Sequence, residues 1–128
     1  MSYLHENGII YADLKPSNIL INEYSKLKFG DFGLSKKISD LTPEKKEINQ
    51  TEERSTHGAP YYMAPELFQD TGVHSFVSDF WALGCLLYEM ATGKPPFYTN
   101  SLKGLIQIIQ EQEVPQIPNF SADFNDLI

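Results

Sequence analysis

The stretch SFVSDFWALGCLLYEMAT, residues 75–92, decides the fold expected of this 128-residue chain. Its residues are apolar on almost every side, a pattern typical of a helix inside a protein rather than on its surface. Gly93 and the Pro95-Pro96 pair follow, and they are expected to end the helix because neither residue type continues one well. We therefore predict a buried helix over 75–92 at the centre of the molecule.

The N-terminal part of the chain predicts a helix end followed by a β-hairpin. Residues 1–8 are typical of the last turns of a helix that stops at Gly8, since glycine is common just past helix C-termini. Two short apolar runs come next, NILIN (18–22) and KLKFG (26–30), separated by EYS (23–25). Short apolar runs joined by a tight connection predict an antiparallel pair of strands.

Three further segments complete the predicted elements. Residues 39–56 are polar, charged and without periodicity, so we expect a flexible loop there. Leucines and isoleucines recur at helical spacing in 101–113, which predicts an amphipathic helix. SADFNDLI (121–128) begins with a serine suited to cap another helix. The expected fold class is therefore α+β, mainly α, with a small hairpin and at most two short antiparallel strand pairs.

Composition and charge argue against several classes of protein. The net charge is −7 with a single arginine, so binding to nucleic acid by neutralising its phosphates is not expected. No apolar run approaches the ~20 residues that a membrane span needs, and the N-terminus lacks a signal-peptide pattern. The single cysteine, Cys85, cannot form an internal disulfide, which fits a reducing, cytoplasmic location.

The remaining candidate ligands do not form a metal motif. His5, His57 and His74 are too scattered for a metal site, and surface or capping roles are expected for them. Trp81 and Cys85 lie inside the apolar helix and are expected to be core residues.

Three short motifs occur in a meaningful order: DLKPSN (13–18), DFG (31–33) and APE (64–66). A DFG tripeptide alone is weak evidence. All three in this order, with the predicted hairpin between the first two and a polar loop before the third, form a much stronger signal. They match the catalytic loop, the metal-binding motif and the APE motif of protein kinases.

On these motifs the whole chain resembles the large, C-terminal lobe of a eukaryotic protein kinase. The segment THGAPYYMAPELFQDTGVHSFVSDFWALGCLLYEMATGKPPF (56–97) is similar to the Unc-51-like/Fused branch, particularly its Runkel-type members. The resemblance implies a partial kinase domain over 1–128, from the end of the helix before the catalytic loop to the start of a late helix. It also implies that 39–56 is a flexible part of the activation loop.

The resemblance implies a chemical role for five side chains. Asp13 would accept the proton of the substrate hydroxyl, and Lys15 would neutralise the transferring phosphate. Asn18 and Asp31 would supply oxygen ligands to Mg²⁺, as hard cations prefer. Leu20 would lie under the adenine ring of ATP. Taken singly, the polar residues could be ordinary loop or turn residues, and only the combination favours ATP, Mg²⁺ and a protein substrate.

Five more residues are expected to support the site. Gly33 lets the backbone turn where a Cβ would be hindered. Tyr11 would pack under Phe32 in place of the family's usual histidine. A carboxylate inside an apolar helix needs donors. For Asp79 the resemblance implies that these are backbone N–H groups of the catalytic loop near Tyr11, and a local cap is the alternative. Glu66 would lack the arginine partner that the family places in a later helix.

Two positions depart from the family's pattern. Ala12 stands where most kinases carry an arginine that binds a phosphate on the activation loop, so switching through that pocket is not expected. Ala59 stands where serine/threonine kinases usually carry a threonine, whose hydroxyl bridges the positions matching Asp13 and Lys15. The first change alters regulation, and the second lowers the expected catalytic efficiency.

None of the 128 residues matches the glycine-rich loop, strand lysine or helix glutamate that grip ATP in this family. We therefore expect a fragment truncated at both ends, whose small lobe would precede Met1. Three hypotheses follow. The parent protein is a serine/threonine kinase, or it is a pseudokinase-like scaffold that binds nucleotide weakly and docks scaffold or cytoskeletal proteins. The isolated chain is in either case expected to be inactive.

Overall fold

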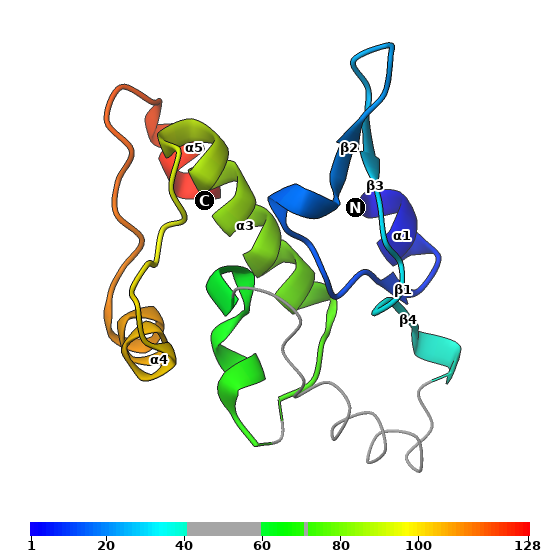
Figure 1. Ribbon diagram of the computed structural model, residues 1–128, viewed down its shortest axis with the longest axis horizontal. Helices are drawn as coiled ribbons and strands as arrows, with labels where there is room; N and C mark the ends of the chain where they lie inside the picture. Colours follow the sequence, from blue (N-terminus) through cyan, green and yellow to red (C-terminus); the bar gives the residue numbers. More distant parts are fainter. Residues whose placement is uncertain (41–59, 71) are drawn as a thin grey trace.

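The computed structural model describes residues 1–40, 60–70 and 72–128, with helix α3 (Phe76–Thr92) across its middle (Figure 1). Helix α1 (Ser2–Glu6) and four short strands lie on one side of α3, and α4 (Leu102–Glu111) lies on the other. Helix α5 (Ala122–Leu127) lies beside α3, where the Ile128 carbonyl closely approaches Gly84. Among the described residues, no helix is both long and apolar enough to cross a membrane.

Helix α3 forms where the apolar run predicted it, and both of its ends are capped. Ser75 Oγ accepts the backbone N–H of Ser78 at 3.2 Å, and Ser78 Oγ accepts that of Ser75 at 2.8 Å. Gly93 follows the helix with a φ of +80°, a left-handed conformation that glycine adopts without strain. The prediction for 75–92 is confirmed to within one residue.

The prediction that this helix is buried holds for only part of its surface. Val77, Phe80 and Met90 are 69%, 55% and 68% exposed. The described residues pack against only part of the circumference of α3. An apolar sequence favours burial without showing which sides of the helix are covered.

Two clusters of buried side chains flank α3 and form much of the core. The helix contributes Ala82 and Leu86 to the first cluster, and Trp81 packs against the second. The first consists of Tyr11, Leu14, Ala82 and Leu86, and the second of Phe97, Leu105 and Ile109. Cys85 is itself buried, so Trp81 and Cys85 are both part of the packed interior, as predicted.

The strands form two antiparallel pairs. Strands β2 (Ile19–Ile21) and β3 (Leu27–Phe29) pair with Ile19 opposite Phe29, which confirms the predicted hairpin. The side-chain oxygen of Asn22 closes the turn by accepting two backbone N–H groups. Strands β1 (Ile9–Ile10) and β4 (Lys36–Lys37) form a second pair, which is within the expected number, but its residues were not predicted.

The helices predicted at both ends of the chain and at 101–113 are confirmed in outline. Helix α1 ends just before Gly8, which has a φ of +70°. Ser101 caps α4 and Ser121 caps α5 by accepting a backbone N–H each. Of the predicted loop over 39–56, residues 39 and 40 instead end a one-turn 3-10 helix, Ile38–Asp40, and the rest lies outside the described residues.

Candidate active site

Residues 11–18, named the catalytic loop after the role predicted for them, connect β1 to β2 and end in a one-turn 3-10 helix, Pro16–Asn18. Pro16 opens this turn, a position that suits its fixed φ. At the end of the turn, the Asn18 carbonyl accepts the backbone N–H of Gly30 at 2.8 Å. This bond aligns the start of β2 with the end of β3, so the catalytic loop lies next to the residue that precedes Asp31.

The carboxylate of Asp13 is held by two side chains of the same loop. Its Oδ1 lies 3.1 Å from Lys15 Nζ, and its Oδ2 accepts an N–H of the Asn18 amide at 2.7 Å. The side chains of Lys15 and Asp13 remain 23% and 19% exposed. Three of the predicted site residues therefore meet around one carboxylate, which stays open to solvent. Charge-assisted bonds of this kind fix its orientation.

Asn18 presents its amide oxygen as a free acceptor. Its Nδ2 donates both to Asp13 Oδ2 and to the Asp13 carbonyl, at 2.7 and 2.8 Å, which uses both N–H groups. Within the described part of the chain, no hydrogen bond reaches Asn18 Oδ1. An amide oxygen is a suitable ligand for a hard cation such as Mg²⁺.

Asp31 has a φ of +45°, which is uncommon for a residue with a side chain. Its Oδ1 accepts the backbone N–H of Gly33 at 3.0 Å, and a Cβ on Gly33 would lie 3.0 Å from that same oxygen. A larger residue at 33 would therefore crowd the turn. Asp31 Oδ2 has no hydrogen-bond partner among the residues that the structure describes, and the side chain is exposed.

The donor set fits Mg²⁺ shared with a nucleotide better than an ion enclosed by protein. In the described ranges, no three His, Cys, Asp or Glu side chains gather as a metal site. Mg²⁺ usually keeps several waters and is held by one or two carboxylates together with substrate phosphates. The free oxygens of Asn18 and Asp31 match that requirement.

Tyr11 is fully buried beneath Phe29 and Phe32, the aromatic residues on either side of Gly30-Asp31. Its ring centroid lies 5.1 Å from that of Phe29 and 5.2 Å from that of Phe32, the second contact being edge-on. The Tyr11 hydroxyl donates to the Gly30 carbonyl. Burial, with the nearby carboxylates of Asp13 and Asp31, raises the pKa of Tyr11 to about 12. The packing expected between Tyr11 and Phe32 is present.

Asp79 connects α3 to the catalytic loop. Its Oδ2 accepts the backbone N–H of Tyr11 and its Oδ1 accepts that of Ala12, both at 2.8 Å, and the residue is 1% exposed. The hydrogen bonds expected of Asp79 are therefore present, and the alternative of a local helix cap is wrong. Ala12 has a φ of +66°, a left-handed conformation that costs energy for a residue with a Cβ.

His5 was missed by sequence reasoning. Its Nε2 lies 2.8 Å from Asp79 Oδ2, and its side chain is only 11% exposed, so the predicted surface or capping role is wrong. The two residues stand far apart in the sequence, and no spacing rule relates them. His74 is half-buried, and burial together with nearby Lys36 lowers its pKa. His57, like Ala59, lies outside the described residues.

Two predicted site residues, Leu20 and Glu66, lie outside the cluster around Asp13. Leu20 is 54% exposed on β2 and packs against Gly30, where an added Cβ would lie 3.1 Å from Leu20 Cδ1. Glu66 is half-buried in the 3-10 helix Pro65–Phe68, and its side chain has no ion pair or hydrogen bond within the described chain.

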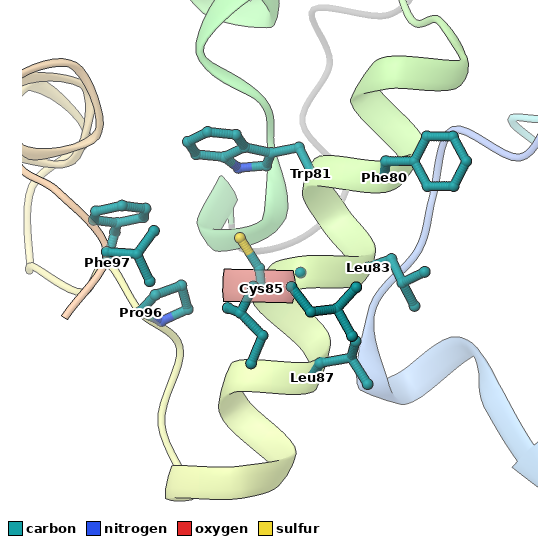
Figure 2. Close-up of a pocket in the computed structure, with 11 residues that line it drawn as sticks. Phe80, Trp81, Leu83, Cys85, Leu87, Pro96 and Phe97 are labelled. Carbon is teal, nitrogen blue, oxygen red and sulfur yellow. The ribbon is translucent and has the colours of Figure 1, made fainter. Parts of the chain in front are cut away.

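An apolar pocket of about 160 Å³ lies along α3 and the Pro96-Phe97 segment (Figure 2). Trp81 and Cys85 line it, and Trp81 Nε1 is buried there without a hydrogen-bond partner in the described chain. Burial raises the pKa of the Cys85 thiol to about 12, which makes it a poor nucleophile. This pocket lacks the charged groups of the catalytic loop.

Comparison with known proteins relates the chain to one family. The family described as "Protein kinase domain" matches residues 1–128. The serine/threonine-protein kinase RUNKEL of Arabidopsis thaliana is 49% identical over 129 residues, which cover 100% of this chain and 9% of that protein. Mitogen-activated protein kinase kinase kinase 3 of the same plant is 45% identical over 131 residues, which cover 100% of this chain and 19% of that protein. Mouse serine/threonine-protein kinase PLK2 is 41% identical over 128 residues, which cover 100% of this chain and 17% of that protein. The chain thus spans less than a fifth of the length of these relatives.

Proposed function

This chain belongs to the protein kinase family, and on that premise we propose that its catalytic loop transfers the γ-phosphate of ATP to a serine or threonine of a protein substrate. One observation carries the proposal: the Asp13 carboxylate is held between Lys15 and Asn18 and is still open to solvent. The proposal includes the assignment of residues 1–128 to the large lobe of a kinase domain.

Asp13 is proposed as the general base. A carboxylate offers about four acceptor positions, and the two bonds to Lys15 and Asn18 leave others for the proton of an incoming hydroxyl. The Lys15 ammonium carries three N–H donors, of which Asp13 takes one. The remaining donors would bind the transferring phosphate and neutralise part of its charge.

Asn18 and Asp31 are proposed to hold Mg²⁺ through the oxygens that no described residue engages. When bound, the metal neutralises charge on the phosphates of the nucleotide during transfer. Leu20 offers an exposed apolar surface on β2, next to Gly30, for the adenine ring. Gly33 keeps Asp31 in the turn that leaves its Oδ2 available.

A scaffold that binds nucleotide weakly and docks protein partners, among them scaffold or cytoskeletal proteins, is a second candidate. Ala12 favours it, because the methyl group cannot bind a regulatory phosphate as an arginine does. Ala59 favours it as well, since it provides no hydroxyl for the catalytic loop. The four side chains proposed for catalysis and metal binding are nevertheless all present: Asp13, Lys15, Asn18 and Asp31.

Phosphate transfer and nucleotide binding, measured side by side, separate the two candidates. The protein at its full natural length is assayed for transfer from MgATP to a protein acceptor, and its melting temperature is titrated with MgATP. Transfer supports the kinase proposal. A thermal shift without transfer supports the scaffold, and the absence of both contradicts the two proposals.

For the 128 residues alone we propose no detectable phosphate transfer. None of them matches a glycine-rich loop or a phosphate-gripping strand lysine, so ATP would be held from one side only. Hydrolysis of ATP by the purified chain that is lost in Asp31→Asn would contradict this.

A further inference from the structure

His5 sits in a built site on the first two turns of α3. Its ring centroid lies 4.4 Å from that of Phe76 and 5.1 Å from that of Phe80, and its Nε2 meets Asp79 at 2.8 Å. Positions 76, 79 and 80 share one face of the helix, because residues three and four apart are neighbours. The two aromatic rings therefore orient the imidazole toward the carboxylate.

From the described residues, Asp79 accepts three hydrogen bonds in a nearly water-free setting. The donors are His5 Nε2 and the backbone N–H groups of Tyr11 and Ala12. An ionised carboxylate can only accept, so His5 must carry a proton on Nε2 to make its bond. Oδ2 takes two of these three bonds, and within the described part of the chain His5 is the one side chain that donates to Asp79.

The backbone that Asp79 holds is strained one residue before Asp13. Ala12 has a φ of +66°, and such a conformation persists only where the surroundings enforce it. The bond from Ala12 N–H to Asp79 provides that enforcement at 2.8 Å. Any rotation of the Asp79 carboxylate would therefore release Ala12 and change the direction of Asp13.

We infer that His5 is a positioning residue for Asp13, acting through Asp79 and Ala12. Its N–H fixes the rotation of the Asp79 carboxylate, the carboxylate holds Ala12 in the left-handed conformation, and this aims the proposed base. The effect on transfer rests on the proposed function, whereas the effect on the loop does not. His5 touches none of the proposed nucleotide or metal ligands.

Two variants of His5 separate positioning from packing. His5→Phe keeps a ring against Phe76 and Phe80 but removes the donor. His5→Gln keeps a side-chain N–H near the place of Nε2. Tyr3→Phe, on the same helix and 73% exposed, is the matched control.

Amide hydrogen exchange in the 128-residue chain, followed residue by residue, is the first measurement. We expect His5→Phe to speed exchange at Tyr11 and Ala12 by about tenfold relative to Leu86 in α3, the effect of one lost bond to a charged group. His5→Gln should retain most of the protection, and Tyr3→Phe all of it. Equal acceleration at Leu86, or no change at Ala12, would overturn the inference.

Phosphate transfer by the protein at full length is the second measurement. His5→Phe should lower kcat by about tenfold with the KM for ATP unchanged, because the orientation of Asp13 is lost while ATP binding is kept. His5→Gln should restore much of the rate. A loss of kcat that His5→Gln fails to restore would overturn the role of the N–H. If the wild-type protein transfers no phosphate, the proposed function fails, and the exchange measurement still decides the role of His5.

Discussion

The carboxylate of Asp79 accepts the backbone N–H of Ala12 at 2.8 Å, although the two residues belong to elements far apart in the sequence. Helix α3 thus reaches the catalytic loop through one buried side chain rather than through apolar packing alone. Asp79 is 1% exposed, so its charge is stabilised by these donors and very little by water. In this account the position of Asp13 consequently depends on Asp79, a buried residue outside the catalytic loop.

Asp79→Asn is expected to destabilise the fold. The amide has one acceptor oxygen, and its NH₂ group would face a donor, so at least one buried N–H of Tyr11 or Ala12 would lose its partner. We expect the free energy of unfolding to fall by about 3 kcal/mol in urea titrations. The same change at exposed Asp126 should leave it within about 0.5 kcal/mol. An Asp79 variant as stable as the Asp126 variant would contradict the account.

Ala12→Gly is expected to stabilise the fold. Glycine adopts the left-handed φ of +66° without the Cβ penalty, and part of this gain is lost to the greater freedom of the unfolded chain. The free energy of unfolding should rise by about 0.5–1 kcal/mol. Ala91→Gly, the same change inside α3, should lower it by about 1 kcal/mol. Loss of stability in both variants would show that Ala12 is not strained.

The sequence predicted the elements well and the connections between them poorly. The helix at 75–92, the hairpin and the Ser121 cap follow from local patterns, and each was found within a residue or two. The pairing of β1 with β4 was missed because two-residue strands leave no readable alternation.

The site divides in the same way. Asp13, Lys15 and Asn18 lie within six consecutive residues, so a short motif was enough to predict their meeting. His5 could not be found, because nothing in a linear pattern relates it to Asp79. The exposed apolar side of α3 escaped prediction for a related reason, since composition does not show which neighbours cover a helix.

Stability should fall as pH rises from about 10 to about 12, and Tyr11 should cause part of this fall. The unfolded chain loses the phenolic proton near pH 10, whereas the folded chain keeps it until about 12, so high pH favours the unfolded state. Tyr11→Phe should make the decline shallower in urea titrations across this range. Part of the decline in stability should remain in this variant, because burial also raises the pKa values of Tyr62 and Cys85. Tyr24→Phe, at a 74% exposed position, should leave the slope unchanged, and an equal slope in the Tyr11 variant would refute the prediction.

Mn²⁺ with ATP should mark the proposed metal ligands. The paramagnetic ion is expected to broaden the NMR signals of the Asn18 side-chain amide and of the Gly33 backbone, because their neighbouring oxygens would hold it. Asn18→Ala should weaken the broadening at Gly33, and Asp31→Asn should weaken it at the Asn18 amide. Asp126→Asn should weaken neither. Broadening that is strongest elsewhere in the described chain would contradict the assignment.

The most direct test of the account is phosphate transfer from MgATP to a protein acceptor by the protein at full length, compared between wild type and Asp13→Asn. The substitution keeps the volume of the side chain and an oxygen for Asn18, but it removes the basic carboxylate. The account predicts that the rate falls by about 10²–10⁴-fold, the usual contribution of a general base. Transfer at an unchanged rate in Asp13→Asn would contradict it.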